Sequence, residues 1–217
     1  MTAEVKRKSY AYSEVDISEV ARYSGARELG GELGTLINSC LSEAERENAV
    51  NYEVCYVKTP IEINGGEVRT PYAVFKSLSL AENLCGSDSA VIFACTLGIG
   101  IDRLIKKYSD KTPSRALIFQ ALGAERIETF TDLFLKDLSK EIGEKLSRRF
   151  SPGYADFSLE AQRDIFSILN PTKLIGLTLN DSLIMSPSKS ITAIVGVGAE
   201  GKKNKCENCG GDCLYKK

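Results

Sequence analysis

The residues best suited to hold a charged ligand follow one another in one short segment, Arg149-Phe-Ser-Pro-Gly-Tyr154. Pro152 fixes φ and lacks an N–H, and Gly153 admits positive φ, so the backbone turns sharply and presents Tyr154. A guanidinium, bare backbone groups and an aromatic ring close together suit a ligand that carries a carboxylate and a flat ring. The plainer alternative is the stop of a long helix, followed by a surface tyrosine.

A second set of reactive side chains lies near the C-terminus, where Cys206, Cys209 and Cys213 follow one another closely. Gly210 and Gly211 allow the chain to wrap tightly between them, and the lysines nearby lower thiol pKa values. Three thiolates on one short loop can ligate zinc or an iron–sulfur cluster, with the fourth ligand from elsewhere. A reducible tail or a local disulfide is the alternative, and we expect the metal.

Glu128 is a candidate for a different reason, because it shares a helical stripe with small residues that a ligand can approach closely. That stripe contains Ala121, Ala124 and Thr131. A carboxylate placed there can bind an ammonium group. From the pattern alone, however, an ordinary solvated glutamate is the better interpretation.

Two further motifs match known sites without their companion residues. Ala90–Gly100 predicts a strand, a Gly-x-Gly turn and a helix, as in a dinucleotide or Rossmann-type methyltransferase loop, but Arg103 takes the third glycine position. A tight strand-to-helix turn is the better interpretation. Ser186-Pro-Ser-Lys189 matches the Ser-x-x-Lys of acylating serine enzymes, and a match this short is expected by chance.

Composition excludes several classes of function. The absence of histidine rules out Ser-His-Asp and Cys-His nucleophiles, histidine-ligated zinc, and a corrinoid module that donates a histidine to cobalt. A net charge of −1 with 26% charged residues argues against a nucleic-acid binder. No apolar run is long enough to cross a membrane, and the first residues lack a secretory signal, so we expect a cytoplasmic protein.

Together these segments resemble the activation (reactivation) domain of cobalamin-dependent methionine synthase, in its free-standing form. Arg149, Gly153 and Tyr154 keep the spacing of the Arg-x-x-x-Gly-Tyr element of that family. The resemblance covers roughly residues 15–217. The other matching segments are the polar patch Asn180-Asp-Ser182, the Met-x-Pro-x-x-Ser element Met185–Ser190, and upstream Val91–Gly98 and Ala124–Phe130.

The resemblance implies a protein that binds S-adenosylmethionine and supports the reductive methylation of cob(II)alamin in methionine biosynthesis. The cobalamin is supplied by a partner, a corrinoid-carrying methionine synthase, and the electron by a donor such as flavodoxin or ferredoxin. Glu128 is expected to hold the ammonium group of the ligand and Arg149 its carboxylate region. Tyr154 packs on the ligand, while Pro152 and Gly153 shape the turn. A family tyrosine beyond the last shared strand has no counterpart here.

Two alternatives belong to other classes of protein. In the first, the C-terminal cysteines are the working part of a non-catalytic metal or redox module, and the body is a docking scaffold. In the second, the protein is a conventional S-adenosylmethionine methyltransferase that uses the Gly98–Gly100 loop.

The elements that carry these residues predict an α+β fold, with a twisted, largely antiparallel sheet and clustered helices. Apolar residues at helical spacing predict one long helix from Thr112–Pro113 to Arg148. Cys40, Cys55, Cys85 and Cys95 are expected to be small core residues. We expect one domain over residues 1–197 and a basic, cysteine-containing tail over 198–217. The other expected helices are 31–48, 77–84 and 158–169, and the other expected strands begin near 52, 72, 90, 176 and 191.

Overall fold

The computed structural model describes residues 3–11, 14–26 and 30–198. Its centre is a four-stranded antiparallel sheet in the order β1-β2-β6-β9, which confirms the expected α+β class. A three-stranded sheet, β3-β4-β5, and a two-stranded one, β7-β8, accompany it. The strands are β1 Lys6–Tyr10, β2 Tyr52–Pro60, β3 Glu62–Asn64, β4 Glu67–Arg69, β5 Val74–Lys76, β6 Ser89–Thr96, β7 Thr178–Leu179, β8 Met185–Ser186 and β9 Ser190–Val197.

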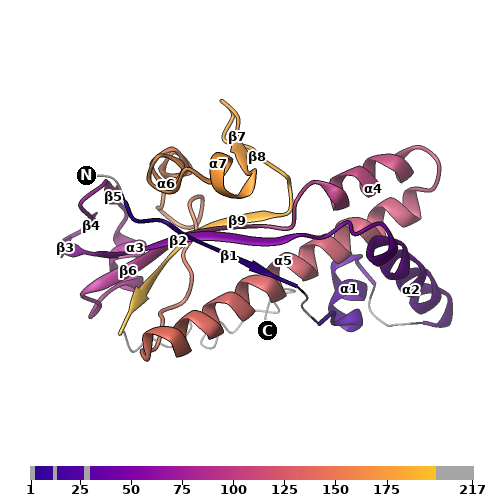
Figure 1. The fold of residues 1–217 in the computed structure, drawn as a ribbon, viewed down its shortest axis with the longest axis horizontal. Helices are drawn as coiled ribbons and strands as arrows, with labels where there is room; N and C mark the ends of the chain where they lie inside the picture. Colours follow the sequence, from indigo (N-terminus) through magenta and orange to yellow (C-terminus); the bar gives the residue numbers. More distant parts are fainter. Residues whose placement is uncertain (1–2, 12–13, 27–29, 199–217) are drawn as a thin grey trace.

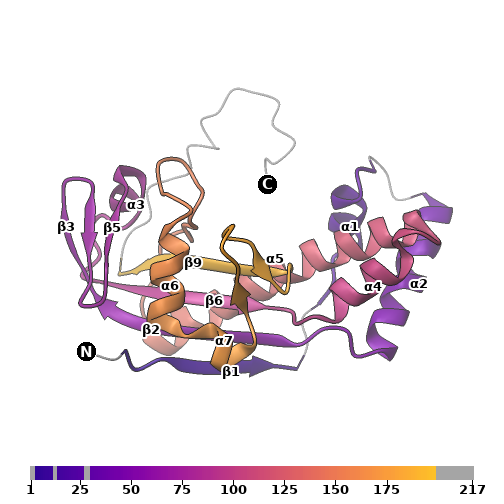
Figure 2. The same ribbon diagram turned by 90° about the horizontal axis from the view of Figure 1, so that it is seen from above.

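Helices cover both faces of the central sheet and extend it at one end. Figure 1 shows α5 along one face and α6 with α7 on the other, while α1, α2 and α4 gather at the end opposite β3–β5. In Figure 2, which is turned by 90°, α1, α2 and α4 again lie at the opposite end of the molecule from β3 and β5. The helices are α1 Ile17–Tyr23, α2 Gly31–Arg46, α3 Leu78–Asn83, α4 Gly100–Ser109, α5 Pro113–Ile142, α6 Ala161–Leu169 and α7 Pro171–Ile175.

The alternation of apolar residues along β2, β6 and β9 builds a core on each face of the sheet. Because successive side chains point to opposite faces, Phe93 faces α5 while Ile92 faces α3 and α6. Phe93 stands between Tyr56 and Ala193 in the register, and all three pack in the core on the α5 side. No helix in the described part of the chain combines the length and the apolar character that crossing a membrane requires.

A third core joins α1, α2 and α4 to the N-terminal half of α5. At its edge the buried carboxylate of Glu43 on α2 accepts hydrogen bonds from Lys107 Nζ at 2.8 Å, Tyr108 Oη at 2.7 Å and the Arg115 guanidinium. Burial alone would raise the pKa of Glu43, and these three donors instead lower it to about 2. One carboxylate therefore ties α2, α4 and α5 together.

The long helix is present but ends earlier than the sequence pattern predicts. It stops at Ile142 because Gly143 adopts φ 77° and donates its N–H to Ser139, the usual glycine termination of a helix. The next residues run along the edge of β9, with isolated bridges from Leu146 to Val197 and from Phe150 to Ile194. Leu146 packs against the core on the α5 side of the sheet, which is the core that a continued helix would also have contacted.

One strand was not predicted, and two smaller expectations needed correction. The strand is β1, whose Lys-Arg-Lys run forms an exposed edge strand, a common way of protecting a sheet edge from further pairing. The helix expected from Ser158 begins at Ala161, after a turn in which the Ser158 hydroxyl accepts from the Glu160 N–H at 3.3 Å. Cys85 is exposed beyond the end of α3, whereas Cys40, Cys55 and Cys95 are buried as expected.

Candidate functional site

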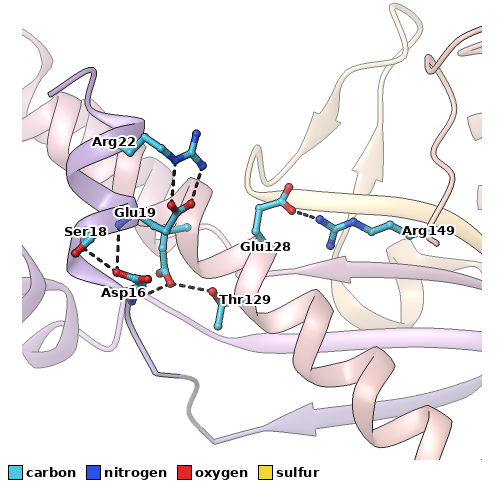
Figure 3. A network of polar contacts seen from close by, with 8 residues as sticks. Asp16, Ser18, Glu19, Arg22, Glu128, Thr129 and Arg149 are labelled. Carbon is cyan, nitrogen blue, oxygen red and sulfur yellow. Dashed lines mark hydrogen bonds and ion pairs between the residues drawn. The ribbon is translucent and has the colours of Figure 1, made fainter. Parts of the chain in front are cut away.

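The fold brings Arg149 and Glu128 together from two different elements. Hydrogen bonds of 2.9 Å in both directions between Phe150 and Ile194 hold the segment after α5 against β9, and Arg149 projects from it toward α5. Its guanidinium forms an ion pair with Glu128 (Figure 3). The same guanidinium also lies 3.3 Å from Asp132 Oδ1. The two residues assigned by resemblance are thus neighbours, and here each is the partner of the other.

The arrangement of charge at this point follows from the helix. Glu128 and Asp132 are one turn apart on α5, and two like charges at that spacing destabilise a helix. Arg149 relieves this repulsion because it contacts both carboxylates. Two carboxylates against one guanidinium leave a formal charge of −1, at side chains that are 31%, 61% and 25% exposed respectively. The cluster therefore remains open to a cationic ligand from solvent.

The turn that follows Arg149 presents an aromatic ring, as the sequence predicts. Gly153 has φ +90° and its N–H donates to the Phe157 carbonyl at 2.7 Å, while the Phe157 N–H donates back to Tyr154 at 2.9 Å. A side chain at this φ is strained, so glycine is required. Pro152 is buried beneath the turn, and Tyr154 stands 67% exposed above it.

Asp156 fastens this turn to α3. Its carboxylate accepts from Ser77 Oγ at 2.7 Å, from the Leu78 N–H at 2.7 Å and from the Ser79 N–H at 3.2 Å. These donors, the Ser77 hydroxyl first, hold the pKa of Asp156 well below its usual range. Phe157 then inserts into the core beside Phe75, with ring centroids 5.9 Å apart. The position of Tyr154 is therefore set by contacts with a helix far away in the sequence.

We expect the Asp156→Ala variant to loosen this turn without unfolding the sheet. The amides of Leu78 and Ser79 lose their acceptor, and their hydrogen exchange should become several times to about ten times faster. The exchange of amides in β6 should not change. Asp164→Asn, which alters an exposed carboxylate on α6, is the matched control. Equal exchange in parent and Asp156→Ala would show that Phe157 alone holds the turn.

A second polar network adjoins the Glu128–Arg149 pair. Glu125 Oε1 accepts from the Asp16 N–H at 3.1 Å and from Thr129 Oγ1 at 2.8 Å, and burial raises the pKa of this carboxyl. Figure 3 shows the network on one side of Glu128 and Arg149 reaching Glu128 from the other. The network borders a hollow of about 530 Å³ lined by Glu14, Val15, Asp16, Ile17, Glu125 and Thr129. Polar groups thus continue past Glu128 toward the start of α1.

Several of these residues escaped the sequence analysis. Asp132 had a signal, because it lies one helical turn after Glu128. Asp16 had one too, since an Asp three residues before Glu19 is a common start of a helix, and its carboxylate caps α1. Asp156 had none, because its partners lie in a distant segment.

The expected stripe of small residues around Glu128 is largely wrong as an approach surface. Ala121 and Thr131 are 2% and 0% exposed, and the Thr131 hydroxyl donates to the Ile127 carbonyl at 2.7 Å. Ala124 alone among the three is partly exposed. The contact that Glu128 makes is instead with Arg149, which also contacts Asp132.

The two weaker motifs serve packing. A side chain at Gly100 would meet the Ala49 carbonyl oxygen at 2.3 Å, so the Gly-x-Gly loop is a close contact between backbones, as the simpler interpretation has it. Lys189 extends over Gly123 and donates to Gln120, rather than serving as a base for Ser186.

The three buried thiols of the described residues, those of Cys40, Cys55 and Cys95, are structural. Burial raises the pKa of Cys55 to about 12, and burial also raises the pKa values of Cys40 and Cys95. Such thiols stay protonated and unreactive. The described residues contain no group of three side chains placed to hold a metal ion. The expected metal ligands Cys206, Cys209 and Cys213 lie outside the described residues.

The chain is similar to one protein family and to at least one solved structure. A protein-family model described as "Vitamin B12 dependent methionine synthase, activation domain" matches residues 78–216. A solved structure, "Crystal Structure of the MetH Reactivation Domain bound to AdoHcy", is similar with a TM-score of 0.70 and 15% sequence identity. The match covers 94% of this chain and 81% of that chain. At this identity the likeness shows a shared fold. A search of curated protein sequences returned no match.

Proposed function

Because the chain belongs to the family of vitamin B12 dependent methionine synthase activation domains, we propose that it binds S-adenosylmethionine and supports the reductive methylation of a corrinoid held by a partner methionine synthase. The observation that carries the proposal is the charged cluster of Glu128, Asp132 and Arg149, together with the exposed Tyr154, which follows Arg149 by five residues. The similar MetH reactivation domain, solved with AdoHcy bound, supports the choice of ligand.

The charge of the cluster suits this ligand. S-adenosylmethionine carries a sulfonium, an ammonium and a carboxylate, and its net charge of about +1 opposes the formal −1 of the cluster. Glu128 receives the ammonium group and Arg149 the carboxylate, as charge-assisted hydrogen bonds. Tyr154 packs on the ligand and excludes water, and Pro152 with Gly153 fixes the turn that carries it.

The reaction asks for alignment rather than proton transfer. One electron from a donor such as flavodoxin or ferredoxin would reduce the partner's cob(II)alamin to cob(I)alamin. The cobalt would then attack the methyl carbon and form the cobalt–carbon bond, while the sulfur–carbon bond breaks, its electron pair stays on sulfur, and S-adenosylhomocysteine leaves. No proton moves in this step, so a protein without histidine is suited to it. This chain contributes by holding the sulfonium in line with the incoming nucleophile, the kind of positioning that accounts for about 7–11 kcal/mol in favourable cases.

The proposed role assigns no contact with the ligand to the C-terminal cysteines. Zinc or an iron–sulfur cluster at Cys206, Cys209 and Cys213 remains a prediction, as does the boundary between a body over residues 1–197 and a tail over 198–217. The alternative of a conventional methyltransferase has lost its main support, because the backbone of Ala49 fills the space beside Gly100.

Calorimetric titration tests the ligand assignment directly. S-adenosylmethionine should bind saturably and one to one, and adenosine, which lacks the charged end, should bind at least about tenfold more weakly. Equal affinity for both would place the charged cluster outside the site. No binding of S-adenosylmethionine at all would remove the proposed function.

A further inference from the structure

Arg149 has two carboxylate partners, and the family resemblance assigns a role to one of them. Glu128 is the partner that we expect to contact the ligand. Asp132 lies on the same face of α5, one turn closer to the C-terminal end of the helix, with Oδ1 3.3 Å from Arg149 Nη1. At 61% exposed against 31%, its side chain stands farther into solvent than that of Glu128.

Ligand binding at this cluster requires an exchange of partners. In the described structure Glu128 and Arg149 neutralise each other, so neither is free for the charged end of a ligand. Once the ligand ammonium takes Glu128, the guanidinium loses its partner on that side. It must still stay near Glu128 to reach the ligand carboxylate, and a flexible arginine without a counter-charge gains entropy by turning into water.

Asp132 is placed to prevent that loss. It contacts the other end of the same guanidinium, through Nη1 rather than Nη2, so its contact does not compete with the one that Glu128 releases. We propose that Asp132 is a positioning residue, which keeps Arg149 in the site while Glu128 changes partner from Arg149 to the ammonium group of the ligand. This inference rests on the proposed binding of S-adenosylmethionine.

The test measures S-adenosylmethionine binding by calorimetry in the full chain and five variants. Asp132→Asn should weaken binding about two- to fivefold, the range for a largely exposed ion pair. Asp132→Glu should restore most of the loss. In an Arg149→Ala background, Asp132→Asn should have no further effect, because Asp132 acts through that guanidinium. Glu141→Gln, an exposed carboxylate farther along α5 that faces Lys8, controls for the general loss of negative charge.

The outcomes separate this inference from the proposal on which it rests. Failure of the parent protein to bind S-adenosylmethionine would remove both. Binding by the parent, together with an unchanged affinity in Asp132→Asn, would overturn the role of Asp132 alone. An equal loss with and without Arg149 would also overturn it, since the carboxylate would then act on the ligand or on the fold directly.

Discussion

Methylcobalamin should form from cob(II)alamin when this protein is added to a corrinoid-carrying methionine synthase that lacks its own activation region. The reaction should require S-adenosylmethionine and a low-potential reductant, because only the reduced cobalt attacks the sulfonium. The measurement is the change from the absorption spectrum of cob(II)alamin to that of methylcobalamin. We expect essentially no conversion without this protein, since an intermolecular complex has to supply the alignment of sulfur, methyl and cobalt.

The controls for this assay come from the charged cluster. Arg148→Ala, which alters an exposed arginine next to the site, should support full conversion. Arg149→Ala should convert slowly at ligand concentrations that saturate the parent. Conversion at the same rate in the absence of the protein would show that it has no part in reactivation. No conversion with every component present would favour the metal or redox module instead.

Arg149→Ala and Glu128→Gln should each weaken the binding of S-adenosylmethionine by about ten- to a hundredfold. Each variant removes a charge-assisted hydrogen bond to the ligand, which is worth on the order of 1.5–3 kcal/mol. Each also removes the ion pair that the ligand must open, and this gain offsets part of the loss. Calorimetry of the two single variants and the double variant measures both quantities at once.

Comparison of the double variant with the two single variants measures how strongly Glu128 and Arg149 are coupled in ligand binding. The loss in the double variant should be larger than the sum of the two single losses, because each single variant already gains from no longer opening the ion pair, and the double variant can gain this only once. Thermal unfolding checks that both variants keep the fold, since each side chain lies at the surface of α5 or of the β9 edge. Parental affinity in both single variants would mean that the ligand lies elsewhere.

The apolar pattern predicted most of the elements because it follows from which of their faces are buried. Helix α2 turns one apolar stripe to a single core, and β6 is apolar along its length because both of its faces meet a core; both were predicted within a few residues. The end of α5 was not, because Leu146 fits a helical pattern and an edge segment equally well. The helix ends because Gly143 adopts a left-handed backbone conformation. The sequence alone does not indicate whether a glycine ends a helix or only bends it.

The spacing of residues in the sequence predicted only those parts of the site whose residues are close to one another in the chain. Arg149, Gly153 and Tyr154 lie within one turn of chain, so their relation was visible in the sequence. Glu128 entered through the family resemblance, and its direct pairing with Arg149 depends on the path of residues 144–150 along β9. Asp156 was out of reach, because its three donors belong to residues 77–79.

One helix belongs to two cores, and this has a mechanical consequence. The N-terminal half of α5 is clamped among α1, α2 and α4, and its C-terminal half lies on the sheet, with Glu128 near the junction. A helix of 30 residues is a stiff rod about 45 Å long. A rotation of the N-terminal half of α5 is therefore expected to move Glu128 relative to the backbone of Arg149, which is held beside β9 through Phe150 and contacts α5 through its side chain. Substitutions around Phe119, which lies in the core with α1, α2 and α4, are therefore expected to change the affinity for the ligand by shifting Glu128.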